Sequence, residues 1–430
     1  MRCLPWFPLL AVGYLPWLVS SCVHYTPQPL NASASAARLT SRHLGAKTWT
    51  LRSLTEEAIK NHPDIALARA KYATAVAAVR TAGARPNPTV ALLPQIATPF
   101  KWIEGTYSVD FDWTLETSGK RSKRVVMALA QAEAAAANVI DATWKVRAAV
   151  HKAYVEVYAA EQRVKLANDA IAQQAELLKA YDDKVKAGAE SRSITQQARL
   201  LQAQMKLQAA ESAKLAAVAR ASLAEALAMS VQGLEGANFS FANFESPLRS
   251  APGRRNALTH RADVLAALAD YAAAEASLRL EVAKQYPDIH LNPGYSLDSG
   301  VNKWAIGVGL TLPILNRNEG PIGEAEAKRR EAAAVFESVQ AKVLAECDRA
   351  AATLAAAQKK LATTDALLAE QGQQVAEDER LLKAGSGDRT GLLSAKVERA
   401  ITQASRVDAL AEVHAALGAL EDATQTPLSE

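Results

Sequence analysis

Cysteine, aromatic residues and clustered charge are all scarce in this sequence of 430 residues. Two of the three cysteines, Cys3 and Cys22, lie in the N-terminal segment, which leaves Cys347 without a partner for an intramolecular disulfide once that segment is processed. Aromatic residues make up 6%, and alanine fills long stretches, which favours closely packed helices. The net charge of +4 is spread along the chain. The sequence therefore does not predict a clustered basic face of the kind that binds nucleic acid.

Motifs that carry enzymatic chemistry are also missing. The sequence contains no phosphate-binding loop, no His-Glu-x-x-His helix and no cysteine pair with metal-ligand spacing. Its seven histidines are scattered. We therefore predict a protein that is not an enzyme, with no catalytic residues, no metal ligands and no cofactor.

The N-terminal segment has the features of a processing signal. Arg2 is followed by an apolar stretch, Leu4 to Leu18, that two prolines interrupt and that is too short for a membrane span. Val19-Ser20-Ser21-Cys22 resembles the bacterial lipobox. The resemblance implies a signal peptide over 1–21, acylation of Cys22 and a lipidated extension over 22–53. A plain secretory signal with an incidental cysteine is the alternative.

The rest of the sequence contains two copies of one repeat. Asp64 matches Asp263 at an offset that stays constant along the first helix of each copy, and Lys186 matches Lys383 near the end of the long helix. We place the change of offset, by two residues, in the hairpin between these points, so that Trp113 to Leu115 matches Leu310 to Leu312. The first copy covers 54–229, the second covers 258–423, a connector covers 230–257, and a tail covers 424–430.

Each copy is predicted to fold as helix, strand, strand, long helix, turn and helix. The helices fall near 56–85, 122–186 and 192–229 in the first copy and near 258–284, 321–384 and 390–423 in the second. At 1.5 Å per residue each long helix spans roughly 95–100 Å, about the sum of its two shorter partners. One long helix can therefore run antiparallel to two shorter helices in a coiled coil, with strands at one end and turns at the other.

The strands indicate a membrane barrel. Polar and apolar residues alternate over Thr106–Leu115, Ile289–Leu297 and Lys303–Leu312, whereas Thr89–Ala97 is apolar on both faces. Segments of about ten residues have the length of transmembrane barrel strands. Because four strands cannot close a barrel and lipid does not tolerate an open edge, several chains must share one. The alternative is a soluble sheet in a lipid-anchored coiled-coil tether of the cell envelope.

This layout, from about Leu54 to Ala423, resembles the outer-membrane efflux proteins, or TolC-like channels. The resemblance implies a homotrimer whose twelve strands form one barrel above a periplasmic helical tunnel, joined to a periplasmic adaptor and an inner-membrane pump. It implies a passive, lipid-anchored channel in the outer membrane. Leu115 to Arg121 and Pro313 to Gly320 resemble junctions of the heavy-metal branch, but Ser118, Leu315 and Glu319 depart from its pattern. Heavy-metal cations are therefore the implied substrates, with drug or protein export as the alternative.

Two groups of residues are candidate sites. Polar residues of the strands are predicted to line the pore, or merely to hydrate it: Asp110, Asp112, His290 and Asn292. The resemblance implies that residues at the two turns close the tunnel and dock the adaptor: Lys186, Gly188, Glu190, Ser191, Arg192, Lys383, Gly385, Asp388 and Arg389. The basic run Lys120, Arg121, Lys123 and Arg124 is predicted to meet lipid phosphates or to be a solvated charge run.

Overall fold

The computed structural model describes residues 25–95, 105–242, 244 and 254–428. The predicted signal peptide and Cys22 lie outside these residues. The chain divides into two compact units, 1–42 and 43–430. In the described part of the first unit, helix α2 (Ala32–Thr40) begins where the Asn31 side chain accepts a hydrogen bond from the amide of Ala34.

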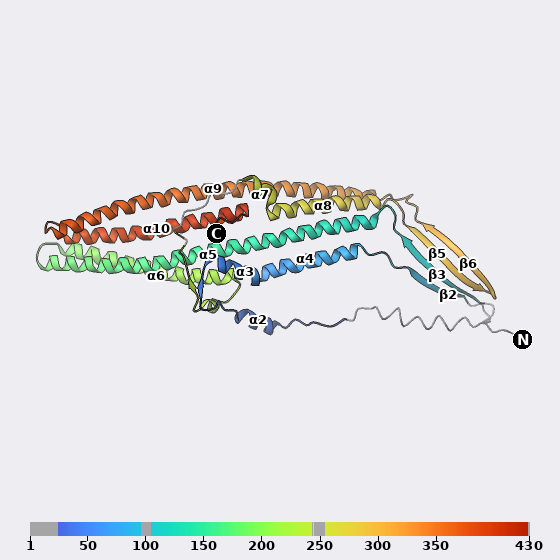
Figure 1. The fold of residues 1–430 in the computed structure, drawn as a ribbon, viewed down its shortest axis with the longest axis horizontal. Helices are drawn as coiled ribbons and strands as arrows, with labels where there is room; N and C mark the ends of the chain where they lie inside the picture. Colours follow the sequence, from blue (N-terminus) through green and yellow to red (C-terminus); the bar gives the residue numbers. More distant parts are fainter. Residues whose placement is uncertain (1–24, 96–104, 243, 245–253, 429–430) are drawn as a thin grey trace. The chain divides into compact units, whose positions relative to one another are not determined.

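The second unit contains helical hairpins and one four-stranded sheet (Figure 1). Its elements in the first copy are α3 (Leu51–Asn61), α4 (Pro63–Ala82), β2 (Thr89–Gln95), β3 (Thr106–Leu115), α5 (Lys120–Lys186) and α6 (Arg192–Ala226). Those of the second copy are α7 (Arg254–His260), α8 (Ala262–Ala283), β5 (Ile289–Asp298), β6 (Val301–Leu310), α9 (Glu319–Lys383) and α10 (Arg389–Thr424). Between the copies lie the 3-10 turn η1 (Val231–Leu234) and β4 (Asn238–Phe239), which pairs in parallel with β1 (Thr48–Trp49).

The first helix of each copy is broken, where the sequence predicted a continuous one. His62 takes an extended conformation between α3 and α4, because a residue before proline is kept out of the helical region. Arg261 is extended at the matching position between α7 and α8, although no proline follows it. Helix α7 also begins inside the segment predicted as connector, four residues ahead of the expected helix start at 258.

The long helices have different surroundings. Helix α5 has 67 residues and packs against α3, α4, α6, α8 and α10, whereas α9 has 65 residues and packs against α7, α8 and α10. By length and composition α5 could cross a membrane, and 28% of its most apolar window is buried in the described chain. Midway along α5, Tyr154 and Tyr158 pack against Phe241 and Phe244 of the connector.

The sheet is antiparallel with strand order β2-β3-β5-β6. Ser299 and Gly300 connect β5 to β6 with positive φ angles of 48° and 85°, the backbone of a tight hairpin turn. Strands β2 and β6 are the edges and have no further partner in the described chain. Figure 1 shows the sheet at the end of the helices away from the α5–α6 and α9–α10 turns.

The structure corrects the predicted position of the change in offset. Val90 pairs with Phe111 in the first hairpin, and Ile289 pairs with Leu310 in the second, so Phe111 rather than Trp113 corresponds to Leu310. Gly119 and Asn318, both left-handed, then precede α5 and α9. The offset is therefore unchanged through the sheet, and the two residues are lost within the long helix, because α9 is shorter than α5.

Candidate channel wall and aperture

The predicted pore-lining residues gather on one face of the sheet. In the strand register Asp110 lies opposite Gly294, His290 opposite Gly309, and Asn292 opposite Gly307. A Cβ at Gly294 would fall 2.5 Å from a carboxylate oxygen of Asp110, so a larger residue there would require the Asp110 side chain to move. The other face carries exposed apolar side chains: Val90, Leu92, Phe111, Trp113, Trp304, Ile306 and Val308.

His290 and Asp112 form a hydrogen-bonded pair on the polar face. The Nδ1 atom of His290 lies 3.0 Å from Oδ1 of Asp112 and 3.4 Å from Oγ1 of Thr114. Among the described residues no group of three or more His, Cys, Asp or Glu side chains could hold a metal ion. The polar face therefore offers no built metal site in this part of the chain.

The basic run after β3 is bound within the chain at several points. The Lys120 amine donates to Asp288 and to the carbonyl of Tyr286, both at 2.7 Å, and the amide of Thr117 also donates to Asp288. Lys120 is buried. It therefore ties the first copy to the second at the sheet–helix junction and is not available to lipid phosphates.

The two arginines of the run complete this junction. Arg121 donates to the carbonyl of Gly83 at 2.6 Å. Arg124 donates to both carboxylate oxygens of Glu116 and to the carbonyls that end α4. Carbonyl groups at a helix C-terminus lack helical partners, so these guanidinium groups fix the end of α4 against the start of α5.

The two turns at the far end of the helices share one design. Gly188 and Gly385 follow the long helices with φ angles of 74° and 76°, a conformation that favours glycine after a helix. Ser191 then caps α6 through the amide of Ser193. Asp388 caps α10 by accepting hydrogen bonds from the amides of the two residues after Arg389.

An ion pair ties these turns together. The Lys184 amine lies 2.9 Å from Oδ1 of Asp388 and 2.8 Å from Oγ1 of Thr390. Hydrogen bonds from Thr390 and Lys184 hold the pKa of the Asp388 carboxyl well below its usual range. Nearby, Leu393 of α10 is buried in a cluster with Leu177 of α5. The two hairpins of one chain are therefore joined by charge and by packing.

Sequence reasoning missed Lys184. It pointed to Lys186, which is exposed and lies only 3.7 Å from Asp183 of its own helix. Glu190, Arg192 and Arg389, which were also predicted to lie at the aperture, make no ion pair within the described part of the chain. One signal in the sequence could have pointed to Lys184. Its counterpart in the second copy is the apolar Leu381, so the two copies differ in charge at this position.

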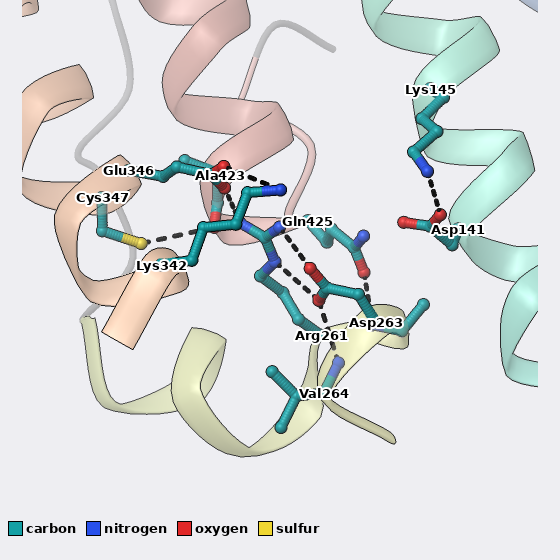
Figure 2. Close-up of polar contacts among 11 residues, drawn as sticks. Asp141, Lys145, Arg261, Asp263, Val264, Lys342, Glu346, Cys347, Ala423 and Gln425 are labelled. Atoms are coloured by element: carbon teal, nitrogen blue, oxygen red, sulfur yellow. Dashed lines mark hydrogen bonds and ion pairs between the residues drawn. The ribbon is translucent and has the colours of Figure 1, made fainter. Parts of the chain in front are cut away.

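A second cluster joins helices α8, α9 and α10 of the second copy, at the break between α7 and α8 (Figure 2). Arg261 donates to Asp263 at 2.7 Å, to Glu346 at 2.9 Å and to the carbonyl of Ala423 at 3.0 Å. Burial opposes its charge, but the hydrogen bonds with the two carboxylates outweigh burial and raise the pKa of Arg261. The thiol of Cys347 also donates to Ala423, so this cysteine is a packed core residue.

A sheet with one polar and one apolar face, carried at the end of two long helical hairpins, is the architecture of TolC-like outer-membrane channel subunits. Residues 54–229 and 254–425 match the outer membrane efflux protein family, and the chain belongs to that family. Its members are passive channels of the outer membrane, not enzymes. The protein is therefore an outer-membrane efflux channel component.

Individual relatives agree with this assignment. The chain is 30% identical over 223 residues to the cobalt-zinc-cadmium resistance protein CzcC of Cupriavidus metallidurans, a match that spans 50% of this chain and 52% of that protein. The crystal structure of the outer membrane protein VceC of Vibrio cholerae is 22% identical, with a TM-score of 0.69 over 87% of this chain and 96% of VceC. That of CusC is 17% identical, with a TM-score of 0.72 over 88% and 92%. These likenesses confirm the predicted fold class.

Proposed function

We propose that this chain forms a homotrimeric duct in a tripartite efflux system, which carries heavy-metal cations from a periplasmic adaptor and inner-membrane pump to the exterior. The observation that carries the proposal is the four-stranded sheet with one exposed apolar face and two unpaired edges. Such a sheet is stable in lipid only when its edges are paired. Three chains of four strands supply twelve, which is within the range of closed outer-membrane barrels.

The choice of metal cations rests on three features. CzcC is named for resistance to cobalt, zinc and cadmium, and the junction at Pro313 to Gly320 resembles that of the heavy-metal branch. The polar face of the sheet offers Asp110, Asp112 and His290, whose oxygen and nitrogen atoms attract cations. Because the described residues hold no built metal site, we assign selection among ions to the pump and assign to this chain a water-filled path.

The ends of the duct take different roles in this proposal. The turns around Gly188 and Gly385 form the periplasmic aperture and dock the adaptor, and Lys184 with Asp388 keeps the two turns of one chain together. Cys22 remains the predicted site of acylation. A Cys22→Ser variant tests it directly, because loss of the lipid should abolish labelling by a palmitate analogue while the wild-type chain stays labelled.

The function is tested in a strain that lacks the gene. We expect complementation to restore resistance to cobalt, zinc or cadmium ions, and the purified protein to be a trimer that conducts ions in planar bilayers. An Asp110→Asn, Asp112→Asn variant is the matched control for the polar face, and it should lose cation preference while it keeps the trimer. Sensitivity confined to hydrophobic drugs and dyes would refute the metal assignment. A monomer without conductance would refute the duct and support an envelope tether.

A further inference from the structure

A groove in the first copy lies where the second copy has a filled cluster. The groove has a volume of about 690 Å³ and is lined by the start of α4, the middle of α5 and the end of α6. The matching elements of the second copy are α8, α9 and α10, and where they meet they hold the Arg261 cluster (Figure 2). The duplication therefore allows the open place and the filled place to be compared residue by residue.

The backbone is alike at the two places. His62 and Arg261 are both extended, with φ and ψ of −71° and 130° in the first and of −62° and 142° in the second. Just after the last helix of each copy, Ala228 and Gln425 have positive φ angles of 50° and 47°. The difference between the two places therefore comes from their side chains.

One of the carboxylates that binds Arg261 is missing from the first copy. The buried Val146 of α5 matches the buried Val343 of α9, and this alignment pairs Ala149 with Glu346. Glu346 accepts a hydrogen bond from Arg261 at 2.9 Å. A methyl group thus stands in the groove where the second copy has a carboxylate.

Two further replacements widen the groove. Gln425 accepts a hydrogen bond from the first amide of α8 at 2.7 Å, whereas α4 begins with Pro63, which has no amide hydrogen, and the position of Gln425 is taken by Ala228. His62 replaces the arginine, and its Nδ1 atom accepts a hydrogen bond from the amide of Asp64 at 3.2 Å. The imidazole therefore caps its own helix and does not take the place of the guanidinium group.

The other partners of a guanidinium group are retained in the groove. Asp64 stands at the position of Asp263, and Ala226 at the position of Ala423, whose carbonyl accepts a hydrogen bond from Arg261 at 3.0 Å. Ala226 ends α6 and lines the groove. Because carbonyls in the last turn of a helix lack helical partners, this carbonyl can accept a hydrogen bond from a donor in the groove.

The groove also has negative charge that no cation of the chain neutralises. Asp64 and Glu225 both line it, and neither has a lysine or arginine within ion-pair distance in the described part of the chain. The lysines of the groove, Lys145 and Lys152, already face carboxylates of their own helix at 2.6 and 4.0 Å. A guanidinium group suits such a place, because it combines a permanent charge with five N–H donors.

We propose that the groove binds a small molecule that carries an alkylguanidinium group, in the place that Arg261 fills in the second copy. The guanidinium donates hydrogen bonds to Asp64 and to the carbonyl of Ala226, and its alkyl chain lies along Ala149 and the other alanines of α5. A volume of about 690 Å³ is within the range of small-molecule sites, about 300–1,000 Å³. This site does not depend on the proposed duct or on its substrate.

Equilibrium dialysis of the purified full-length protein in detergent tests the proposal. The probe is radiolabelled agmatine, which has a guanidinium group and an ammonium group joined by four carbons. The matched control is putrescine, which has the same chain and charge but an ammonium group at both ends. We expect saturable binding of one agmatine per chain and binding of putrescine that is about tenfold weaker or less, because an ammonium lacks the planar fork of donors.

Variants locate the bound molecule. His62→Arg with Ala149→Glu rebuilds the cluster of the second copy, so it should fill the groove and abolish binding. Asp64→Asn should weaken binding about tenfold, because it removes a charge-assisted hydrogen bond. Asp169→Asn is the matched control, since it removes an exposed carboxylate of α5 that does not line the groove, and it should bind agmatine as the wild type does.

Three results would overturn the proposal: no saturable binding to the wild type, equal affinity for agmatine and putrescine, or equal affinity of Asp64→Asn and Asp169→Asn. The last two would mean that charge attracts the probe without a built site. Circular dichroism shows whether each variant is folded. If the double variant is not, Ala149→Leu fills the groove without adding charge and should abolish binding in its place.

Discussion

Gly418 is the position where one added methyl group should disturb the joint between the two copies most sharply. It lies on α10 against His151 of α5, and a Cβ atom built at Gly418 would fall 2.5 Å from Cε1 of His151 and still closer to Nδ1. Carbon atoms in contact are normally about 3.5–4.0 Å apart, so the helices or the ring must retreat by about 1 Å or more. His151 is 3% exposed and has little room to move.

The expected cost follows from these distances. Overpacking of this kind costs about 1–3 kcal/mol, and alanine returns about 0.5–1 kcal/mol in a helix interior relative to glycine. Gly418→Ala should therefore destabilise the joint by about 0.5–2 kcal/mol, which corresponds to roughly two- to thirtyfold faster hydrogen exchange if the amides of α10 exchange by local opening. Exchange measured by mass spectrometry on peptides from the end of α10 reports this change.

Two further variants decide whether the steric reasoning is right. In a His151→Ala background the added methyl group meets no ring, so Gly418→Ala should become neutral or slightly stabilising. Gly372→Ala in α9 is the matched glycine control, because a Cβ there meets nothing within 4 Å, and it should slow exchange. If Gly418→Ala costs the same with and without the His151 ring, the proposed contact is not the cause.

Three other outcomes follow from the charged groups. Asp388→Ala should lose both the α10 cap, worth about 0.5–2 kcal/mol, and the ion pair with Lys184, whereas Asp388→Ser should lose only the ion pair. If this ion pair restrains the aperture, both Asp388 variants and Lys184→Met should raise single-channel conductance. Burial lowers the pKa of His151 to about 4, so the unfolded chain takes up a proton near pH 6.5 and the folded chain does not until about pH 4. Stability should fall by up to ~3 kcal/mol as the pH drops through that window, and thermal melting should show a smaller acid loss in His151→Gln. Arg261→Met removes the guanidinium that Asp263 and Glu346 share, while Glu346 keeps Lys342 and Asp263 keeps the amide of Val264. The variant should cost at most about 3–5 kcal/mol, seen as a lower melting temperature and faster exchange at the start of α8.

The sequence was sufficient for the architecture because its signals are local and repeated. Strict alternation located β3, β5 and β6, although β6 begins and ends two residues before the predicted range. The turns were found from Gly188 and Gly385, whose positive φ angles suit glycine. The matched lengths of the helices then placed strands and turns at opposite ends. The same reasoning predicted the polar face that carries Asp110, Asp112 and His290, although their role in conduction is still a prediction.

The sequence was not sufficient for contacts between the copies, because these join residues that are far apart in the chain. Lys120 pairs with Asp288, and Lys184 with Asp388. Lys120 begins a run of basic residues and Lys184 follows two aspartates, and each segment looks solvated when read alone. Within the second copy, Arg261 was noticed only as part of the repeat, although two of its partners, Glu346 and Ala423, lie on other helices. Sequence spacing also misplaced the change of offset, which only the strand register could locate.

The differences between the copies say where the proposed assembly is weakest. Within a chain the junction is closed by Lys120 with Asp288 and the far end by Lys184 with Asp388. The positions that match Lys184 and Asp388 in the other copy hold Leu381 and Ser191, which cannot form an ion pair. In the proposed trimer the six hairpins at the aperture would then consist of three pairs, each joined within one chain by Lys184 and Asp388, without the same ion pair between neighbouring chains. Because an aperture opens where its contacts cost least to break, neighbouring subunits should part from one another while the two hairpins of each chain stay together.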